Sequence, residues 1–329
     1  MRIRILFILF IIPILYSAQA PDTENIKRKE IFALRIEKSP KIDGILDDEV
    51  WKNAPIAKDF IERNPQNGKP EPADYKTFVK VLYDDTGIYF GMEMHDPHPE
   101  NIAKELTERD NIGTDDVVGV TINGYNDKQQ AVLFILQASG VQVDAKIASN
   151  SNDDFTWNAV WYSAVKINDN GWCAEIKIPY SELRFSKKDV QTWGINFIRA
   201  IQKTNQNITW NHVDNKKGTY LLYDGTLQNV EKIKPPVRLS FLPYFSTYIN
   251  NFNGKTTNNI NGGMDVKYGI NDAFTLDTTL IPDFGQTNFD STILNLSPFE
   301  QQYQEQRSFF TEGTELFSKG DLFYSRRIG

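Results

Sequence analysis

The chain has 329 residues, enough for one large domain or two of ordinary size. Hydrophobic residues make up 40% and charged residues 24%, a balance typical of globular rather than disordered proteins. The net charge is −7 without a basic block after the first residues, which argues against nucleic acid as a partner. Cys173 is the only cysteine, so an intrachain disulfide and a thiolate metal cluster are excluded.

The first twenty residues have the three parts of a secretory signal peptide. A cationic start, Met1 to Arg4, precedes an apolar run from Ile5 to Tyr16 and a small-residue ending, Ser-Ala-Gln-Ala. The apolar run is too short to cross a bilayer as a helix, which takes about 20 residues. We expect residues 1–20 to be removed on export, with cleavage after Ala18 as the alternative, and residues 21–37 to form a polar lead-in segment.

From there to about residue 230 the chain predicts short strands separated by Gly, Asn and Asp turns. Phe78 to Tyr83 and Ile88 to Met92 flank an Asp-Asp-Thr-Gly turn and predict a hairpin. Val117 to Ile122 and Ala131 to Gln137 predict a second pair of strands. Only 101–109 and 181–183 have a helical pattern.

A third pair has the clearest period of two. Every second residue from Trp157 to Ile167 and from Trp172 to Ile178 is small or apolar, so these residues are expected to face a core. Cys173, Glu175 and Lys177 are then expected to face water. With two more strands predicted at 193–201 and 208–213, the pattern predicts an all-β, jelly-roll-like β-sandwich of antiparallel sheets over residues 38–230.

The pattern changes after a proline-marked linker at 231–236. Three later segments, starting near residues 237, 264 and 274, alternate apolar and polar residues between Asn/Gly turns. This is typical of outer-membrane β-barrel strands, although a soluble antiparallel sheet alternates in the same way. Because these strands are too few to close a barrel, we expect residues 237–329 to be the N-terminal strands of a barrel and the chain to be a fragment of a longer protein.

Two resemblances extend this reading. The segment Lys41 to Trp51, followed by Asp115-Asp116-Val117, Gly171 to Pro179 and Trp193 to Phe197, resembles carbohydrate-binding module family 9 over about residues 38–230. This resemblance implies a non-catalytic module that binds a saccharide, of a kind similar to modules with structural calcium.

The C-terminal part resembles a Bacteroidota family of unknown function, in which such a sandwich precedes a large outer-membrane barrel. That resemblance implies this architecture and a location in the cell outer membrane, and it implies no known activity. With the signal peptide we expect an exported protein, and the order along the chain favours the periplasm for the sandwich, with a surface position as the alternative. The segments that carry the resemblance are Pro282 to Phe284, Asn295 to Glu300, Arg307 to Gly313 and Tyr324 to Gly329.

Aromatic side chains are the expected saccharide contacts, because sugar rings pack their C–H faces on aromatic rings. Four candidates follow, with core packing as the alternative for each: Trp157, Trp161, Trp210 and Tyr220. The family holds its sugar between two tryptophans. Here the first position falls on Ile112 and the second near Tyr220, with Trp210 upstream as the alternative. The clamp is therefore not intact, and a fold that has lost its site is an alternative.

The carboxylates predict no catalysis. Neighbouring residues on a strand point to opposite faces, so adjacent aspartates do not supply the facing pair that a glycosidase needs. Four of them are weak candidates for a structural calcium, with turn chemistry as the alternative: Asp115, Asp116, Asp153 and Asp154. The sequence has no glycine-rich phosphate loop and no Gly-x-Ser-x-Gly elbow, and we expect a protein that is not an enzyme and that requires no cofactor beyond such a calcium.

Three functions remain in order of preference. The first is a non-catalytic, saccharide-binding module attached to an outer-membrane barrel. The second is a transport or secretion channel whose sandwich is a periplasmic plug or docking domain without sugar binding. The third, least supported, is a part of a glycoside hydrolase system.

Overall fold

The structure is a computed structural model that describes residues 28–149, 153–155, 157–216, 218–234, 239–270, 274–281, 294 and 303. The expected signal peptide, residues 21–27 of the lead-in segment, and all the segments that carry the second resemblance lie outside this part of the chain. In the described residues, no helix combines the length and the apolar character that crossing a membrane requires.

The larger sheet of the sandwich has eight strands. Its main path runs β1-β14-β12-β7-β8-β9, with β13 paired to β12 and β4 paired to β13. Its strands are β1 Glu30–Phe32, β4 Ile61–Asn64, β7 Val117–Asn123, β8 Gln130–Gln137, β9 Gln142–Ala148, β12 Val190–Ile201, β13 Gln206–Thr209 and β14 Gly225–Glu231.

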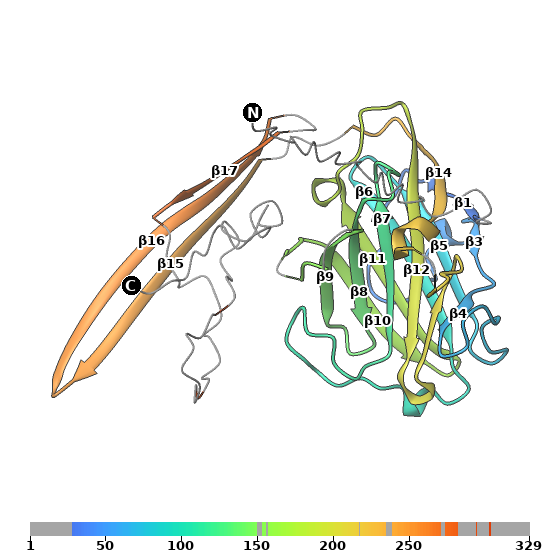
Figure 1. The fold of residues 1–329 in the computed structure, drawn as a ribbon, viewed down its shortest axis with the longest axis horizontal. Helices are drawn as coiled ribbons and strands as arrows, with labels where there is room; N and C mark the ends of the chain where they lie inside the picture. The colour runs from blue at the N-terminus through green and yellow to red at the C-terminus, as the bar shows by residue number, and fades with distance from the viewer. Residues whose placement is uncertain are drawn as a thin grey trace, which may run out of the picture.

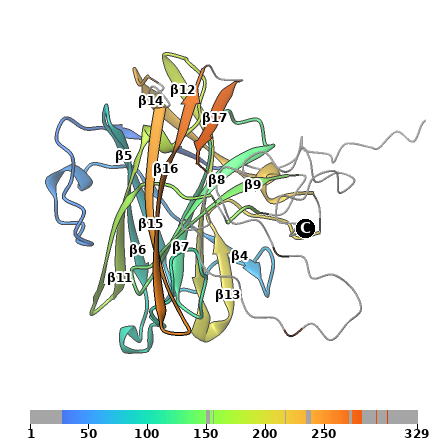
Figure 2. The same ribbon diagram turned by 90° about the vertical axis from the view of Figure 1, so that its left-hand side faces the viewer.

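The smaller sheet has six strands in the order β10-β11-β6-β5-β2, with β3 paired to β5. Figures 1 and 2 show β5, β6 and β11 in one layer and β7, β8 and β12 in the other. The strands are β2 Leu34–Arg35, β3 Ile56–Ala57, β5 Thr77–Tyr83, β6 Gly87–His95, β10 Tyr162–Asn168 and β11 Gly171–Pro179.

The core lies between these sheets because each strand points alternate side chains inward. Phe90 of the smaller sheet and Phe197 of the larger sheet meet edge to face, with ring centroids 5.9 Å apart. Trp172 and Trp193 are also buried there. The all-β sandwich and the predicted pairs β5–β6, β7–β8 and β10–β11 are confirmed, and the pairing is antiparallel apart from β1 with β14 and β2 with β5.

A second, smaller core lies on the outer face of the smaller sheet. The segment from Ile36 to Ala54, which we call the cover segment, packs Ile36 and Trp51 against Leu82 and Tyr89. The cover segment contains η1, a 3-10 helix at Glu49–Trp51. Gly44 allows its close approach: its φ is +83°, and a Cβ atom there would lie 2.8 Å from the backbone of Val165.

Glu175 corrects the sequence prediction, because it is completely buried rather than water-facing. It does point away from the main core, as the period of two requires. The cover segment lies over it, however, and supplies three donors to its carboxylate: the backbone N–H groups of Asp43 and Gly44 at 2.8 and 2.9 Å, and Nε1 of Trp51 at 3.0 Å.

The predicted helix at 101–109 is wrong. A short 3-10 turn, η2 Pro99–Asn101, precedes an extended loop that runs to β7. Side chains bind the backbone of this loop in place of a helical ladder: Asp115 accepts the N–H of Glu105, and Gln137 donates to the carbonyl of Asn111 at 2.9 Å. The other 3-10 turns are η3 Tyr180–Glu182, η4 Gln202–Thr204 and η5 Tyr220–Tyr223.

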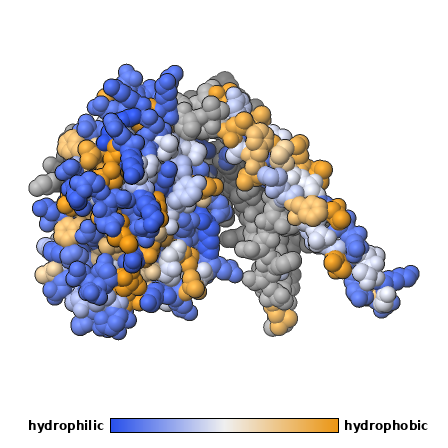
Figure 3. Space-filling view, turned by 180° about the vertical axis from the view of Figure 1, so that it is seen from behind, coloured by the Kyte–Doolittle hydropathy of each residue, from blue (hydrophilic) through white to orange (hydrophobic). Residues whose placement is uncertain are grey.

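Beyond the sandwich, β15 Leu239–Phe252, β16 Lys255–Gly269 and β17 Thr275–Leu280 form a three-stranded antiparallel sheet. The register places a continuous set of exposed apolar side chains on one face, and Figure 3 shows hydrophobic side chains along this sheet and hydrophilic ones toward its hairpin tip. That face contains Leu239, Phe241, Phe245, Ile249, Ile260, Tyr268, Leu276 and Leu280. Whether these strands belong to a barrel stays a prediction.

Candidate functional site

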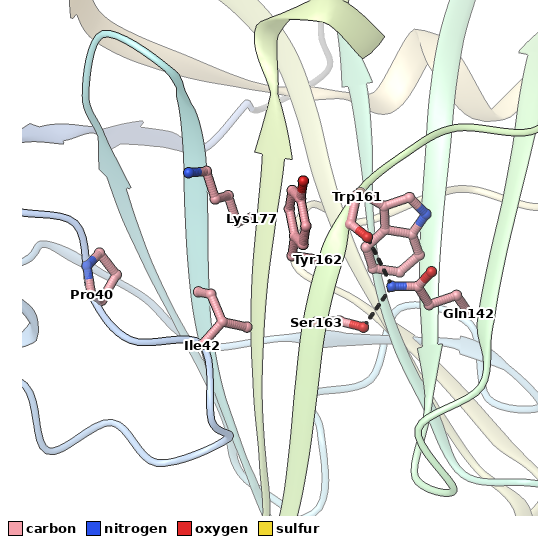
Figure 4. Close-up of a pocket in the computed structure, with 7 residues that line it drawn as sticks. All are labelled: Pro40, Ile42, Gln142, Trp161, Tyr162, Ser163 and Lys177. Atoms are coloured by element: carbon pink, nitrogen blue, oxygen red, sulfur yellow. Dashed lines mark hydrogen bonds between the residues drawn. The ribbon is translucent and has the colours of Figure 1, made fainter.

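A groove of about 560 Å³ lies at the edge of the sandwich where β10 faces β9. Figure 4 shows that its lining comes from three separate parts of the chain: the cover segment, β9, and the neighbouring strands β10 and β11. The lining residues are Pro40, Ile42, Gln142, Trp161, Tyr162, Ser163 and Lys177.

Tyr162 and Lys177 form the floor on the outer face of the smaller sheet. They are direct cross-strand partners on β10 and β11, so their side chains lie next to each other on one face. Tyr162 is 54% exposed, whereas the next residue in this row, Tyr89, lies under the cover segment. The groove therefore forms beside the cover segment, where the row of side chains is no longer covered, and Pro40 and Ile42 form its wall.

Lys177 is held by its neighbours in this row. Its ammonium group lies 5.3 Å from the ring centroid of Tyr89, and the two residues are also cross-strand partners. A cation over the face of an aromatic ring is attracted by the ring quadrupole. The ring therefore positions the ammonium group at the groove without neutralising its charge.

The opposite wall is a hydrogen-bonded network between the two sheets. Gln142 on β9 donates to the carbonyl of Trp161 at 3.2 Å and to Oγ of Ser163 at 2.8 Å (Figure 4). The amide oxygen of Gln142 accepts a hydrogen bond from Arg109 at 2.5 Å. Because both ends of the amide are bound, the side chain of Gln142 is fixed and the hydroxyl proton of Ser163 points to other acceptors.

Asp144 anchors this wall from beneath. It is completely buried, and it accepts hydrogen bonds from Nε1 of Trp161 at 2.9 Å, from the backbone N–H of Ala159 at 2.7 Å, and from Arg109. A buried carboxylate is stable only when it is paired and hydrogen-bonded, and Asp144 is both. Its role is therefore to orient Trp161 and Arg109.

Trp157 and Trp161 lie together, as the sequence predicts. Both rings meet Phe134 edge to face, at centroid distances of 5.9 and 5.5 Å. Trp161 lines the groove but is only 5% exposed, and Trp157 is half-buried with the ammonium of Lys146 5.8 Å from its ring. The predicted strand does not include them, since β10 begins at Tyr162.

Trp210 and Tyr220 lie elsewhere. Trp210 is buried against Phe197 of β12, at a centroid distance of 5.5 Å. Tyr220 is half-buried in η5, and the guanidinium of Arg63 lies 5.3 Å from its ring. The structure thus does not bring these two candidates to the groove, and their contact with a saccharide stays a prediction.

The four calcium candidates form two separate pairs. Asp115 and Asp116 are buried. Asp115 accepts a hydrogen bond from the backbone N–H of Glu105, and Asp116 accepts one from the backbone N–H of Gln202. Asp153 and Asp154 lie in a loop in which Asp154 bridges the backbone of Lys146. Within the described ranges, no group of three or more His, Cys, Asp or Glu side chains is arranged to hold a metal ion.

Four residues of the groove were not predicted as site residues: Tyr162, Gln142, Ser163 and Lys177. One signal for Tyr162 was present: it is a large aromatic residue at a position of the alternating segment that faces water. The other three become visible as a site only when β9 and the cover segment are placed beside β10.

Comparisons with known proteins agree with this architecture. The family model described as "Carbohydrate family 9 binding domain-like" matches residues 42–224, which is more than half of the chain. The model described as "Domain of unknown function (DUF5916)" matches residues 235–329, so the predicted order of the two families is confirmed. None of the curated proteins matches the chain.

Three solved structures align with the sandwich, each over 62% of this chain. Two are a carbohydrate binding module family 9 from Caldicellulosiruptor kristjanssonii, in complex with cellotriose (16% identity, TM-score 0.42, 95% of that chain) and with glucose (16%, 0.43, 97%). The third is the structure of a protein from Bacteroides uniformis ATCC 8492, with 12% identity, a TM-score of 0.48 and 100% of that chain covered. On the match to residues 42–224, the chain belongs to the carbohydrate family 9 binding domain-like family.

Proposed function

We propose that the chain is a non-catalytic saccharide-binding module and that the groove at β10 is its binding site. The observation that carries the proposal is the exposed ring of Tyr162 beside polar groups of Ser163 and Lys177, in a groove built from three parts of the fold. Membership of the family supports the ligand class, and the family's own clamp positions are not intact here.

The groove has the chemistry that a sugar requires. A sugar ring packs its C–H face on an aromatic ring, and its hydroxyls need donors and acceptors at the rim. Tyr162 supplies the ring and a phenolic hydroxyl, Ser163 a hydroxyl proton, and Lys177 an ammonium group. Ile42 and Pro40 add an apolar wall, which suits the C–H edge of a sugar.

We further propose that the protein is exported and that residues 239–281 belong to outer-membrane barrel strands. Three observations support this location: the signal-peptide pattern of residues 1–20, the family match over 235–329, and the exposed apolar face of β15–β17. Such a barrel exposes an apolar band to lipid, which a soluble sheet of this length does not need. The sandwich would then present a saccharide at the envelope.

Titration calorimetry on the 329-residue chain tests the binding proposal. The titration is carried out in a detergent that lacks a sugar headgroup, because a glycoside detergent would compete for the groove. We expect saturable heat with at least one member of a panel of mono- and oligosaccharides, and a loss of about tenfold in affinity in Tyr162→Ala, since about 1.4 kcal/mol corresponds to tenfold.

Tyr125→Ala is the matched control, because Tyr125 is an exposed tyrosine on the β7–β8 turn, away from the groove. It is expected to bind like the unmodified chain. No heat from any saccharide with a correctly folded chain would refute the proposal and favour the alternative, a docking or plug domain of a transport channel.

A further inference from the structure

We propose that the preferred ligand at this groove is an acidic saccharide, one that carries a carboxylate on its ring, as a uronic acid does. The inference rests on the proposed function and adds the substrate class. It follows from the charges that line and surround the groove.

Lys177 is the only charged side chain among the residues that line the groove. Its contact with the ring of Tyr89 holds the ammonium group in place, and a neutral ring supplies no negative charge to pair with it. In the part of the chain that the structure describes, no carboxylate of the lining offsets this charge. A neutral sugar would leave the ammonium group unpaired, whereas a carboxylate would form a charge-assisted hydrogen bond with it.

The carboxylates near the groove are already occupied. Glu175 lies two residues from Lys177 on β11, but the cover segment buries it and binds both of its oxygens. Asp43, on the cover segment, forms an ion pair with Lys41 at 2.8 Å. Asp144 is buried beneath Trp161 and paired with Arg109. Among the described residues, none of these three carboxylates forms an ion pair with Lys177.

The placement of Tyr162 relative to Lys177 fits a ring-bound carboxylate. The two side chains stand side by side on adjacent strands, as cross-strand partners whose Cβ atoms are roughly 5 Å apart. A sugar ring stacked on Tyr162 would extend its edge toward β11, which carries the ammonium group. A carboxylate attached to that edge would meet Lys177, while Ser163 and Gln142 lie on the other side of the Tyr162 ring (Figure 4).

The test compares trigalacturonate with its methyl ester and with cellotriose, by calorimetry on the full chain in a detergent without a sugar headgroup. The ester keeps the ring and removes the charge. We expect trigalacturonate to bind at least tenfold more tightly than either neutral ligand, and raising the salt from 50 to 500 mM to reduce this preference.

Lys177→Gln should abolish the preference and Lys177→Arg should retain it. Lys166→Gln is the matched control, because it removes an equal charge from an exposed position on β10 outside the groove, and it should leave the preference unchanged. Equal binding of the three ligands, or a preference that survives in Lys177→Gln, would overturn this inference and leave the proposed function standing. No binding of these three ligands would overturn this inference, and silence across the whole saccharide panel would overturn the proposed function as well.

Discussion

Substitution of Glu175 tests whether the cover segment is fixed to the sandwich as the structure describes. In Glu175→Gln the volume is kept, but one of the two acceptor oxygens becomes an NH₂ group that faces N–H donors. The donors at Gly44 and Trp51 are buried, so a donor that loses its acceptor has no water to replace it.

The expected loss follows from this geometry. Each buried donor without a partner costs about 1–3 kcal/mol, and relief of the buried carboxylate's desolvation offsets part of that cost. We expect the free energy of unfolding to fall by about 2–4 kcal/mol. All six tryptophans lie in the sandwich, so their fluorescence during urea unfolding at neutral pH reports this change directly.

Glu49→Gln is the control, since Glu49 lies on the same cover segment but forms only an exposed ion pair with Lys52. Its substitution is expected to change the free energy of unfolding by less than about 1 kcal/mol. If Glu175→Gln were as stable as the unmodified chain, the three hydrogen bonds would not hold the cover segment, and the wall of the groove would lose its support.

Three further predictions concern the sandwich. Hydrogen bonds from Tyr89, Thr86 and Ser39 outweigh burial, which alone would raise the pKa of Asp84, and lower that pKa from 3.8 to about 2. As pH falls, the unfolded chain therefore binds this proton first, and about 2 kcal/mol of stability that is present above about pH 4 is lost by about pH 2. In urea unfolding against pH, the loss of stability between these values should be smaller by about 2 kcal/mol in Asp84→Asn. A loss as large as in the unmodified chain would contradict the assignment. In Gly171→Ala a Cβ atom would lie 2.0 Å from a backbone oxygen, at a φ of +138°. The free energy of unfolding should fall by about 3 kcal/mol. In Gly140→Ala, where the added Cβ atom meets no atom within 4 Å, it should fall by only about 1 kcal/mol, and equal losses in the two variants would refute the clash. Trp161→Phe removes the hydrogen bond to Asp144 and should lower the free energy of unfolding by about 1–2 kcal/mol. Saccharide affinity should change little, and a loss of affinity as large as that of Tyr162→Ala would make Trp161 a ligand contact.

The parts of the fold that depend on local sequence were predictable. The Asp-Asp-Thr-Gly turn between β5 and β6, and the Asn-Gly turn between β10 and β11, lie between runs of alternating residues, and each forms a hairpin. Trp157 and Trp161 share one side for the same reason, even though the regular strand begins after them. Period-two alternation is enough to assign which residues face the main core.

The parts that depend on distant contacts were not predictable. Period-two alternation places Glu175 away from the main core but cannot reveal that a segment about 130 residues earlier covers it. The loop after η2 has a helix-like composition, yet Asp115 and Gln137 bind its backbone in an extended form. The groove also depends on distant contacts, because three separate segments line it, and only Trp161 among the four predicted aromatic candidates is at its wall.

The most direct measurement is a crystal structure of the chain with the saccharide that binds most tightly in the calorimetric panel. Our account predicts a sugar ring stacked on Tyr162, with its polar groups at Ser163 and Lys177. A saccharide bound instead against Trp210 and Tyr220, with the groove at β10 empty, would contradict it.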